Sequence, residues 1–94
     1  MTIANATDRT SIFIADRGFV WVCKGYEEDA NGKWVHLMNA RCIRQWGTDG
    51  GLAQLINGPR KETALDAVAP ILTLAYHAVI AIIPCDDSAW APHL

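Results

Sequence analysis

Lys33-Trp-Val-His-Leu-Met-Asn-Ala-Arg-Cys-Ile-Arg-Gln45 is a long strand-like stretch around which the rest of the chain can be arranged. Successive side chains of a strand point to opposite faces. Its even-numbered and odd-numbered residues are therefore expected on different sides of a sheet. The preceding Asn31-Gly32 step is the strongest short-range hairpin signal in the chain. We therefore predict a long β-strand that follows a tight hairpin turn.

Further strand-like segments flank this stretch on both sides. Ser11–Ala15 and Phe19–Lys24 are rich in β-branched and aromatic residues, which favour strands. Ile71–Cys85 is almost unbroken in apolar character and predicts one or two strands that are covered on both faces. Leu52–Ile56 has helical spacing and predicts one short helix, which Gly58-Pro59 ends.

The length of 94 residues indicates a single domain. Residues 1–10 are expected to form a flexible N-terminal arm, residues 11–85 a single β-rich domain, and residues 86–94 a C-terminal tail. Arg60–Pro70 is expected to be an exposed loop. The predicted fold class is mainly β, either a small antiparallel, strongly bent sheet or an SH3-like or Sm-like barrel, with one short α-helix.

The composition of the chain limits the kinds of partner that it is expected to bind. The chain is 51% hydrophobic and only 19% charged, which suggests apolar surface buried between subunits and hence a homo-oligomer. A net charge of −2 and a pI near 5.8 make duplex DNA an unlikely partner, because such binders are usually strongly basic. The apolar run 78–85 is too short to span a bilayer, and the first residues lack the features of a signal peptide, so no membrane association is expected.

The cysteines and histidines indicate no catalytic or metal chemistry. Cys23, Cys42 and Cys85 form no Cys-x-x-Cys pair, lie in apolar runs, and are expected to be buried and reduced, which fits a cytosolic setting. The three histidines, His36, His77 and His93, have no metal-ligand spacing. We therefore expect a protein that is not an enzyme and that uses no metal or cofactor.

The most promising binding segment consists of the end of the long strand and the residues that follow it. Cations, an aromatic face and free backbone amides are the parts of anion and nucleotide sites. The predicted ligand-binding residues are Arg41, Arg44, Trp46, Gly47, Thr48, Asp49 and Gly50. On a regular strand the two arginines would point to opposite faces, so they converge only if the strand bends or two subunits meet.

Plainer structural roles remain open for the same residues. Each arginine could form an ordinary ion pair, with Glu27, Glu28 or Asp29 as partner. The indole of Trp46 could be core or lid rather than a ligand platform. Thr48 or Asp49 could be the N-cap of the Leu52 helix.

The order of features resembles an uncharacterised family of small proteins encoded by tailed bacteriophages. The features that match are Asn39-Ala40-Arg41, Trp46-Gly47, Leu52-Ala-Gln-Leu55, Ile80–Cys85 and Trp90. The chain departs in its longer Asp49-Gly50-Gly51 segment and in Cys42, where a second basic residue would be typical. The resemblance implies a phage origin and action in the host cytoplasm, and it brings no catalytic residues. Tyr76–Cys85 also resembles the closing strand of Sm-like RNA-binding proteins.

Three functions compete. The leading one is a non-catalytic, homo-oligomeric phage protein that sequesters a small anionic or nucleotide-derived ligand of host defence. The second is an Sm-like ring that binds single-stranded RNA through stacking and a few cations. The third is an inhibitor that contacts a host protein and takes no small ligand.

Overall fold

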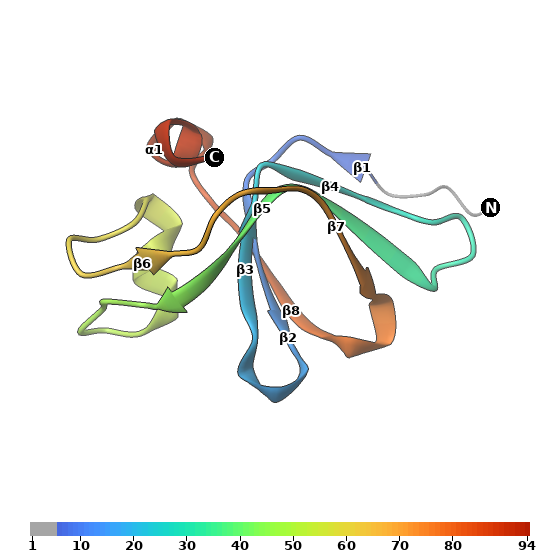
Figure 1. Cartoon of the computed structure of the whole chain (residues 1–94), viewed down its shortest axis with the longest axis horizontal. Coiled ribbons are helices and arrows are strands. Elements are labelled where there is room, and N and C mark those ends of the chain that lie inside the picture. Colours follow the sequence, from blue (N-terminus) through green and yellow to red (C-terminus); the bar gives the residue numbers. More distant parts are fainter. Residues whose placement is uncertain (1–5) are drawn as a thin grey trace.

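The computed structural model describes residues 6–94, and the part of the expected N-terminal arm before residue 6 lies outside them. Eight strands form one curled antiparallel sheet, with a short α-helix at the C-terminus (Figure 1). The strands are β1 (Ala6–Thr7), β2 (Ser11–Ala15), β3 (Val20–Cys23), β4 (Gly25–Glu28), β5 (Trp34–Gln45), β6 (Ala64–Leu65), β7 (Ala69–Ala75) and β8 (Val79–Pro84). The helices are α1 (Asp87–Trp90) and the 3₁₀ turns η1 (Asp16–Gly18), η2 (Leu52–Asn57), η3 (Tyr76–Ala78) and η4 (Ala91–His93).

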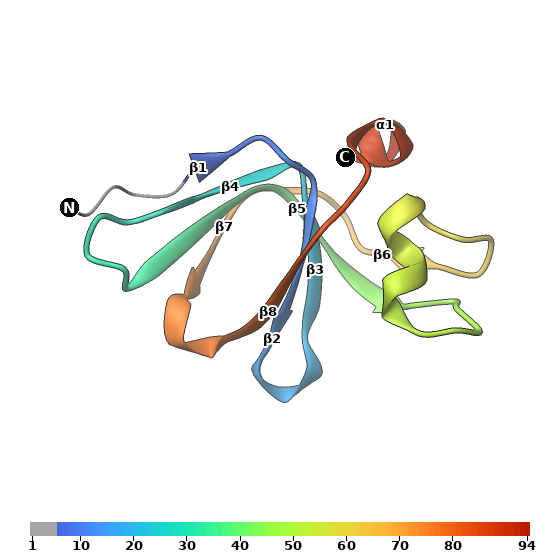
Figure 2. The ribbon, with the colours of Figure 1, turned by 180° about the vertical axis from the view of Figure 1, so that it is seen from behind.

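The twelve-residue strand β5 organises the sheet, as the sequence predicted. Its first half lies between β4 and β7, and its second half lies between β3 and β6. Beyond β3 follow β2 and then β8, so the sheet curls into a half-barrel around β5 (Figure 2). The predicted mainly-β, strongly bent antiparallel sheet is confirmed. No helix among residues 6–94 is long and apolar enough to cross a membrane.

The hairpin before β5 is present, with Gly32 at φ 72° and antiparallel pairing of β4 with β5. The regular alternation predicted along β5 is broken at Asn39, which has a φ of 50°. The buried positions are Val35 and Leu37 before this residue, and Ala40 and Ile43 after it. A left-handed residue inside a strand shifts which side chains face inward, and asparagine tolerates this conformation better than most residues.

The C-terminal segment is part of the core rather than a tail. Trp90 is fully buried in a cluster with residues of β2, β3, β5 and η2, and its Nε1 donates to the carbonyl oxygen of Leu55 at 2.8 Å. Asp86 caps α1 by accepting from the backbone N–H groups of Ser88 and Ala89. The second core cluster lies in the other half of the sheet and contains Phe13, Cys23, Val35, Leu37 and Ala40.

Residues of the expected N-terminal arm also contact the C-terminal segment. The buried Thr10 donates its backbone N–H to Asp87 Oδ1 at 2.6 Å, and residues 6 and 7 form β1. The segments before residue 11 and after residue 85 are therefore bonded to each other.

Three local predictions were wrong in detail. The short helix lies where expected, but it is a 3₁₀ helix, and its N-cap is Gly51 with no side-chain cap, not Thr48 or Asp49. The expected loop 60–70 contains β6 and the start of β7. No residue of β7 or β8 is fully buried, although their apolar run predicted cover on both faces.

Candidate functional site

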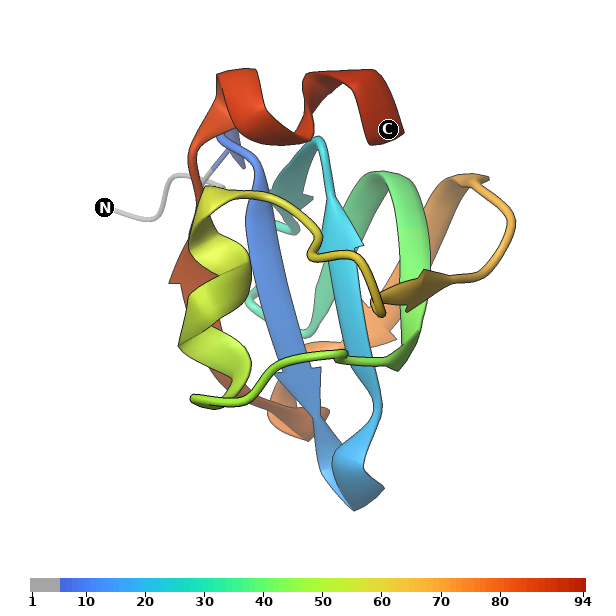
Figure 3. The ribbon, with the colours of Figure 1, turned by 90° about the vertical axis from the view of Figure 1, so that its left-hand side faces the viewer.

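The predicted binding residues lie in one projecting part of the molecule, the end lobe, which consists of residues 41–66. It contains the second half of β5, η2 and β6, at the end of the molecule opposite the hairpin between β4 and β5 (Figure 1). Figure 3 views this end, with η2 in front of the sheet and α1 above it. The lobe carries four of the eight Lys and Arg residues of the chain but only three of the ten Asp and Glu residues.

Arg41 holds the lobe together. Its Nε donates to the carbonyl oxygen of Asp66 at 2.6 Å, and its Nη1 donates to the carbonyl oxygen of His93 at 2.9 Å. The guanidinium therefore links β5 to the segment after β6 and to the C-terminus. This engagement gives Arg41 a positioning role in the lobe.

Arg44 converges on the same residue. Its Nη2 lies 2.7 Å from Asp66 Oδ1, so the acidic partner is Asp66 rather than the expected Glu27, Glu28 or Asp29. The register between β5 and β6 shifts at Arg44, and this irregularity brings both arginines to Asp66 although they are three positions apart. The Arg44 side chain is 75% exposed, and an exposed ion pair of this kind contributes about 0–1 kcal/mol. Arg44 is therefore free to exchange its carboxylate for an anionic ligand at little cost.

Gln54 fixes the loop before η2. Its Oε1 accepts from the backbone N–H groups of Asp49 and Gly50, both at 3.0 Å, and its Nε2 donates to Asp49 Oδ1 at 2.8 Å. The last of these hydrogen bonds is the main reason why the pKa of Asp49 is lowered. Because both amides already have an acceptor, a ligand would have to displace Gln54 to use them.

Trp46 is presented at the start of this loop. Its carbonyl oxygen accepts from Thr63 Oγ1 at 2.6 Å, and the residue is 42% exposed. Gly47 follows with φ 69°, and a Cβ at this position would collide with the backbone of Glu62 and Thr63. The backbone on both sides of the indole is thus held by the facing turn, whereas the ring itself is partly open to solvent.

The loop residues therefore differ in exposure and in whether their backbone amides are already hydrogen-bonded. Thr48 is half-buried, and Asp49 and Gly50 are exposed but bonded to Gln54. Arg60, on the facing turn, is close enough to help lower the pKa of Asp49, so it belongs to the lobe although no sequence pattern connects the two residues. Side chains that sequence reasoning missed, Gln54, Thr63 and Asp66, supply most of the contacts that shape the site.

Comparison with known families gives one match. A model of a domain of unknown function, DUF6948, matches residues 12–92. The chain belongs to this family. Neither the comparison with curated proteins nor that with solved structures gave a significant match. The matched region of the DUF6948 family includes the whole end lobe and also α1, in agreement with the packing of α1 into the core.

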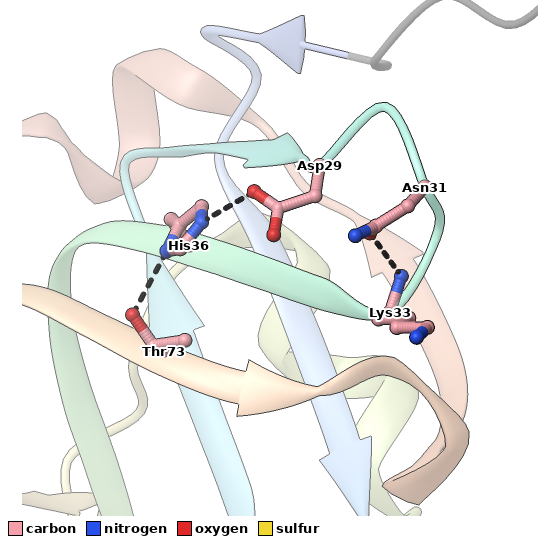
Figure 4. Close-up of polar contacts among 5 residues, drawn as sticks. All are labelled: Asp29, Asn31, Lys33, His36 and Thr73. Carbon is pink, nitrogen blue, oxygen red and sulfur yellow. Dashed lines mark hydrogen bonds and ion pairs between the residues drawn. The ribbon is translucent and has the colours of Figure 1, made fainter.

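A second polar cluster of this DUF6948 domain lies at the opposite end. His36 hydrogen-bonds through Nδ1 to Thr73 Oγ1 and through Nε2 to Asp29 Oδ1, both at 2.8 Å (Figure 4). The imidazole thereby joins β7, β5 and the loop after β4. In the same loop, Asn31 Oδ1 accepts from the backbone N–H of Lys33 at 3.0 Å (Figure 4). These contacts are explained by cross-strand structure, since they rigidify the hairpin before β5.

The thiols of the DUF6948 domain are held in the protonated form. Burial raises the pKa of Cys23 to about 12 and that of Cys85 to about 11. Both are fully buried and unpaired as predicted, whereas Cys42 is only half-buried. A thiol is a weak nucleophile compared with its thiolate, so this environment opposes covalent chemistry at Cys23 and Cys85. Within residues 6–94, no three His, Cys, Asp or Glu side chains gather into a group that could hold a metal ion.

Proposed function

We propose that this domain is a non-catalytic binding module whose end lobe holds a small anionic ligand that carries a planar ring, such as a nucleotide. The observation that carries the proposal is that an exposed indole and an exposed guanidinium lie near each other in the sequence. Trp46 and Arg44 lie two residues apart at the end of β5, and both side chains reach solvent. A ring can stack on the indole while the guanidinium binds a phosphate or carboxylate.

The electrostatics of the lobe support an anionic ligand. Four cations against three acids give the lobe a small positive charge, whereas the whole chain has a net charge of −2. Arg44 and the turn residues Arg60 and Lys61 are all exposed. A local positive patch on an acidic protein suits a small ligand better than a long duplex.

The rigidity of the lobe supports binding as well. Gln54 holds the loop before η2 by a hydrogen bond, and Thr63 links the turn after η2 to the carbonyl of Trp46. Arg41 links the end of β5 to the carbonyl of Asp66. A site whose backbone is already ordered loses little conformational entropy when the ligand binds. Arg41 is thus a positioning residue in this proposal, and Arg44 and Trp46 contact the ligand.

A binding function without catalysis fits the resemblance to small phage proteins. A phage gains by sequestering a nucleotide-derived signal of host defence in the host cytoplasm, and sequestration needs affinity rather than chemistry. An RNA-binding role or a host protein as target is the alternative.

Calorimetry against mononucleotides, cyclic dinucleotides and short single-stranded RNA tests the proposal. Arg44→Ala should weaken binding of the small ligand by about 1.5–3 kcal/mol, which is about ten- to a hundred-fold in Kd. Trp46→Ala should weaken it strongly and Trp46→Phe mildly, because the stacked area carries the contact. Arg17→Ala, at the exposed η1 turn, is the matched arginine control and should bind as wild type.

Three outcomes would overturn the proposal. The first is that no small ligand of the panel binds. The second is that only RNA binds, which would favour the alternative. The third is that Arg17→Ala and Arg44→Ala lower affinity equally, which would indicate nonspecific charge attraction.

A further inference from the structure

The most apolar part of the chain is only partly covered. From Ala67 to Cys85 there is no Asp, Glu, Lys or Arg, yet no residue of β7 or β8 is fully buried. Among residues 6–94, β7 pairs with β5 and β8 pairs with β2, so each strand has one edge without a partner strand. Both strands diverge from η3, as Figure 2 shows. Edge strands without charge readily pair with another chain.

The two free edges are not equivalent. On β8 the register shifts at Ile80, and the strand ends in Pro84, which has no N–H. Bulges and prolines are devices that keep an edge from pairing. β7 also contains a proline, Pro70, and β5 is irregular at the facing Asn39, but the pairing is regular over the next five positions, from Met38↔Ile71 to Trp34↔Ala75. The structure therefore leaves β7 as the edge that is open to a further strand.

The backbone groups available on β7 follow from one hydrogen bond. The N–H of Tyr76 donates to the carbonyl oxygen of Lys33 at 2.8 Å. In an antiparallel ladder, bonded and non-bonded positions alternate. The backbone groups of Ile71, Thr73 and Ala75 consequently point to the free edge, and each offers one N–H and one carbonyl oxygen.

The side chains of these residues share the outer face of the sheet. Ile71 is 63% exposed, and on the neighbouring strand Trp34, which pairs with Ala75, is 47% exposed. Beside the small Ala75 is a hollow of about 360 Å³, lined by Gly32, Lys33, Trp34, Ala75 and His77. A large apolar side chain and a hollow next to a small residue thus occur on the same strand, four positions apart.

We propose that a second copy of this chain pairs with β7, antiparallel and about a twofold axis at Thr73. Each Ile71 then lies opposite Ala75 of the other copy, beside the hollow at Trp34, and the two Thr73 residues lie opposite each other. The edge is self-complementary, because a large residue meets a small one and no like charges meet. The proposal is independent of the ligand proposed for the end lobe.

A matched pair of charge substitutions tests which edge pairs. Ile71 and Ile80 are exposed to similar extents, 63% and 66%, but lie on β7 and β8 respectively. Sedimentation equilibrium of the wild type should give twice the chain mass of 10.3 kDa. Ile71→Lys should weaken the association at least tenfold, and Ile80→Lys should leave it unchanged. Circular dichroism checks that both variants fold.

Disulfide trapping tests the register. Directly opposite residues at a bonded position have Cα atoms about 5.5 Å apart, which a disulfide can bridge. Thr73→Cys should therefore give a covalent dimer on mild oxidation. Ile71→Cys should not, because the second copy's Ile71 is four positions out of register with it. The wild type shows the background from Cys42, the least buried of its cysteines.

Each contrary result overturns the proposal. A wild type that stays at 10.3 kDa up to about 100 μM excludes the dimer. Dissociation by Ile80→Lys but not by Ile71→Lys assigns the interface to β8. A covalent dimer from Ile71→Cys rather than Thr73→Cys shows a different register.

Discussion

Replacement of Trp90 should show that residues 86–94 are part of the core. The indole is fully buried among residues of three sheet strands and η2, and its N–H donates to the carbonyl oxygen of Leu55 at 2.8 Å. Truncating a buried tryptophan to alanine typically costs about 3–5 kcal/mol. Whole domains are stable by only about 5–15 kcal/mol, so Trp90→Ala should remove a large fraction of the free energy of unfolding.

Trp90→Phe separates packing from the hydrogen bond. Phenylalanine keeps most of the apolar contact but removes one of the two donors to the carbonyl oxygen of Leu55. That oxygen still accepts from the backbone N–H of Gly58 at 3.1 Å, so the loss costs about 0.5–1.5 kcal/mol, the net contribution of one hydrogen bond. The expected order of destabilisation is Trp90→Ala, then Trp90→Phe, with Trp46→Ala last. Trp46 is the matched control because its ring is partly open to solvent, and its loss should cost less than about 1 kcal/mol.

Urea denaturation followed by circular dichroism measures these differences. All variants are compared at one protein concentration, since association would shift the apparent stability. If Trp90→Ala unfolds at the same urea concentration as the wild type, the C-terminal segment does not belong to the core. If Trp46→Ala is the more destabilising variant, Trp46 is a core residue and the binding platform proposed for it is wrong.

Two further predictions concern titratable groups. Burial raises the pKa of Cys23 to about 12. Thiol labelling of the native protein at pH 8 should therefore modify Cys42 first and leave Cys23 unmodified until urea is added. Rapid labelling of Cys23 in the native protein, measured by mass spectrometry, would contradict this. The hydrogen bond from the N–H of Thr10 lowers the pKa of Asp87 in the folded protein. The ionised carboxylate therefore stabilises the folded state fully above the ordinary aspartate pKa of about 3.9, and this contribution is lost as pH falls through the lower pKa of the folded state. Asp87→Asn should therefore flatten the decline of Tm between pH 4 and pH 2, and melts that stay parallel to those of the wild type would refute the assignment.

Local signals in the sequence were sufficient for several elements. The Asn31-Gly32 turn, the extent of β5 and the position of η2 depend on neighbouring residues, and all three are present. The features that were missed depend on long-range contacts. Asn39 adopts a left-handed backbone conformation that the neighbouring residues do not predict. The indole N–H of Trp90 donates to the carbonyl of Leu55, which lies 35 positions earlier in the chain.

The candidate site shows the same limit in chemical terms. Residue types correctly marked the lobe as rich in cations and exposed backbone, but they gave no information on which donors are already occupied. Arg41 is bonded to carbonyl groups 25 and 52 positions away, and the amides of Asp49 and Gly50 are bonded to Gln54. A donor with a good acceptor gains little from a ligand, because the new bond only replaces the old one. Of the seven predicted residues, the proposed function therefore assigns direct ligand contact to Arg44 and Trp46, since Arg44 has only an exposed ion pair and Trp46 is 42% exposed.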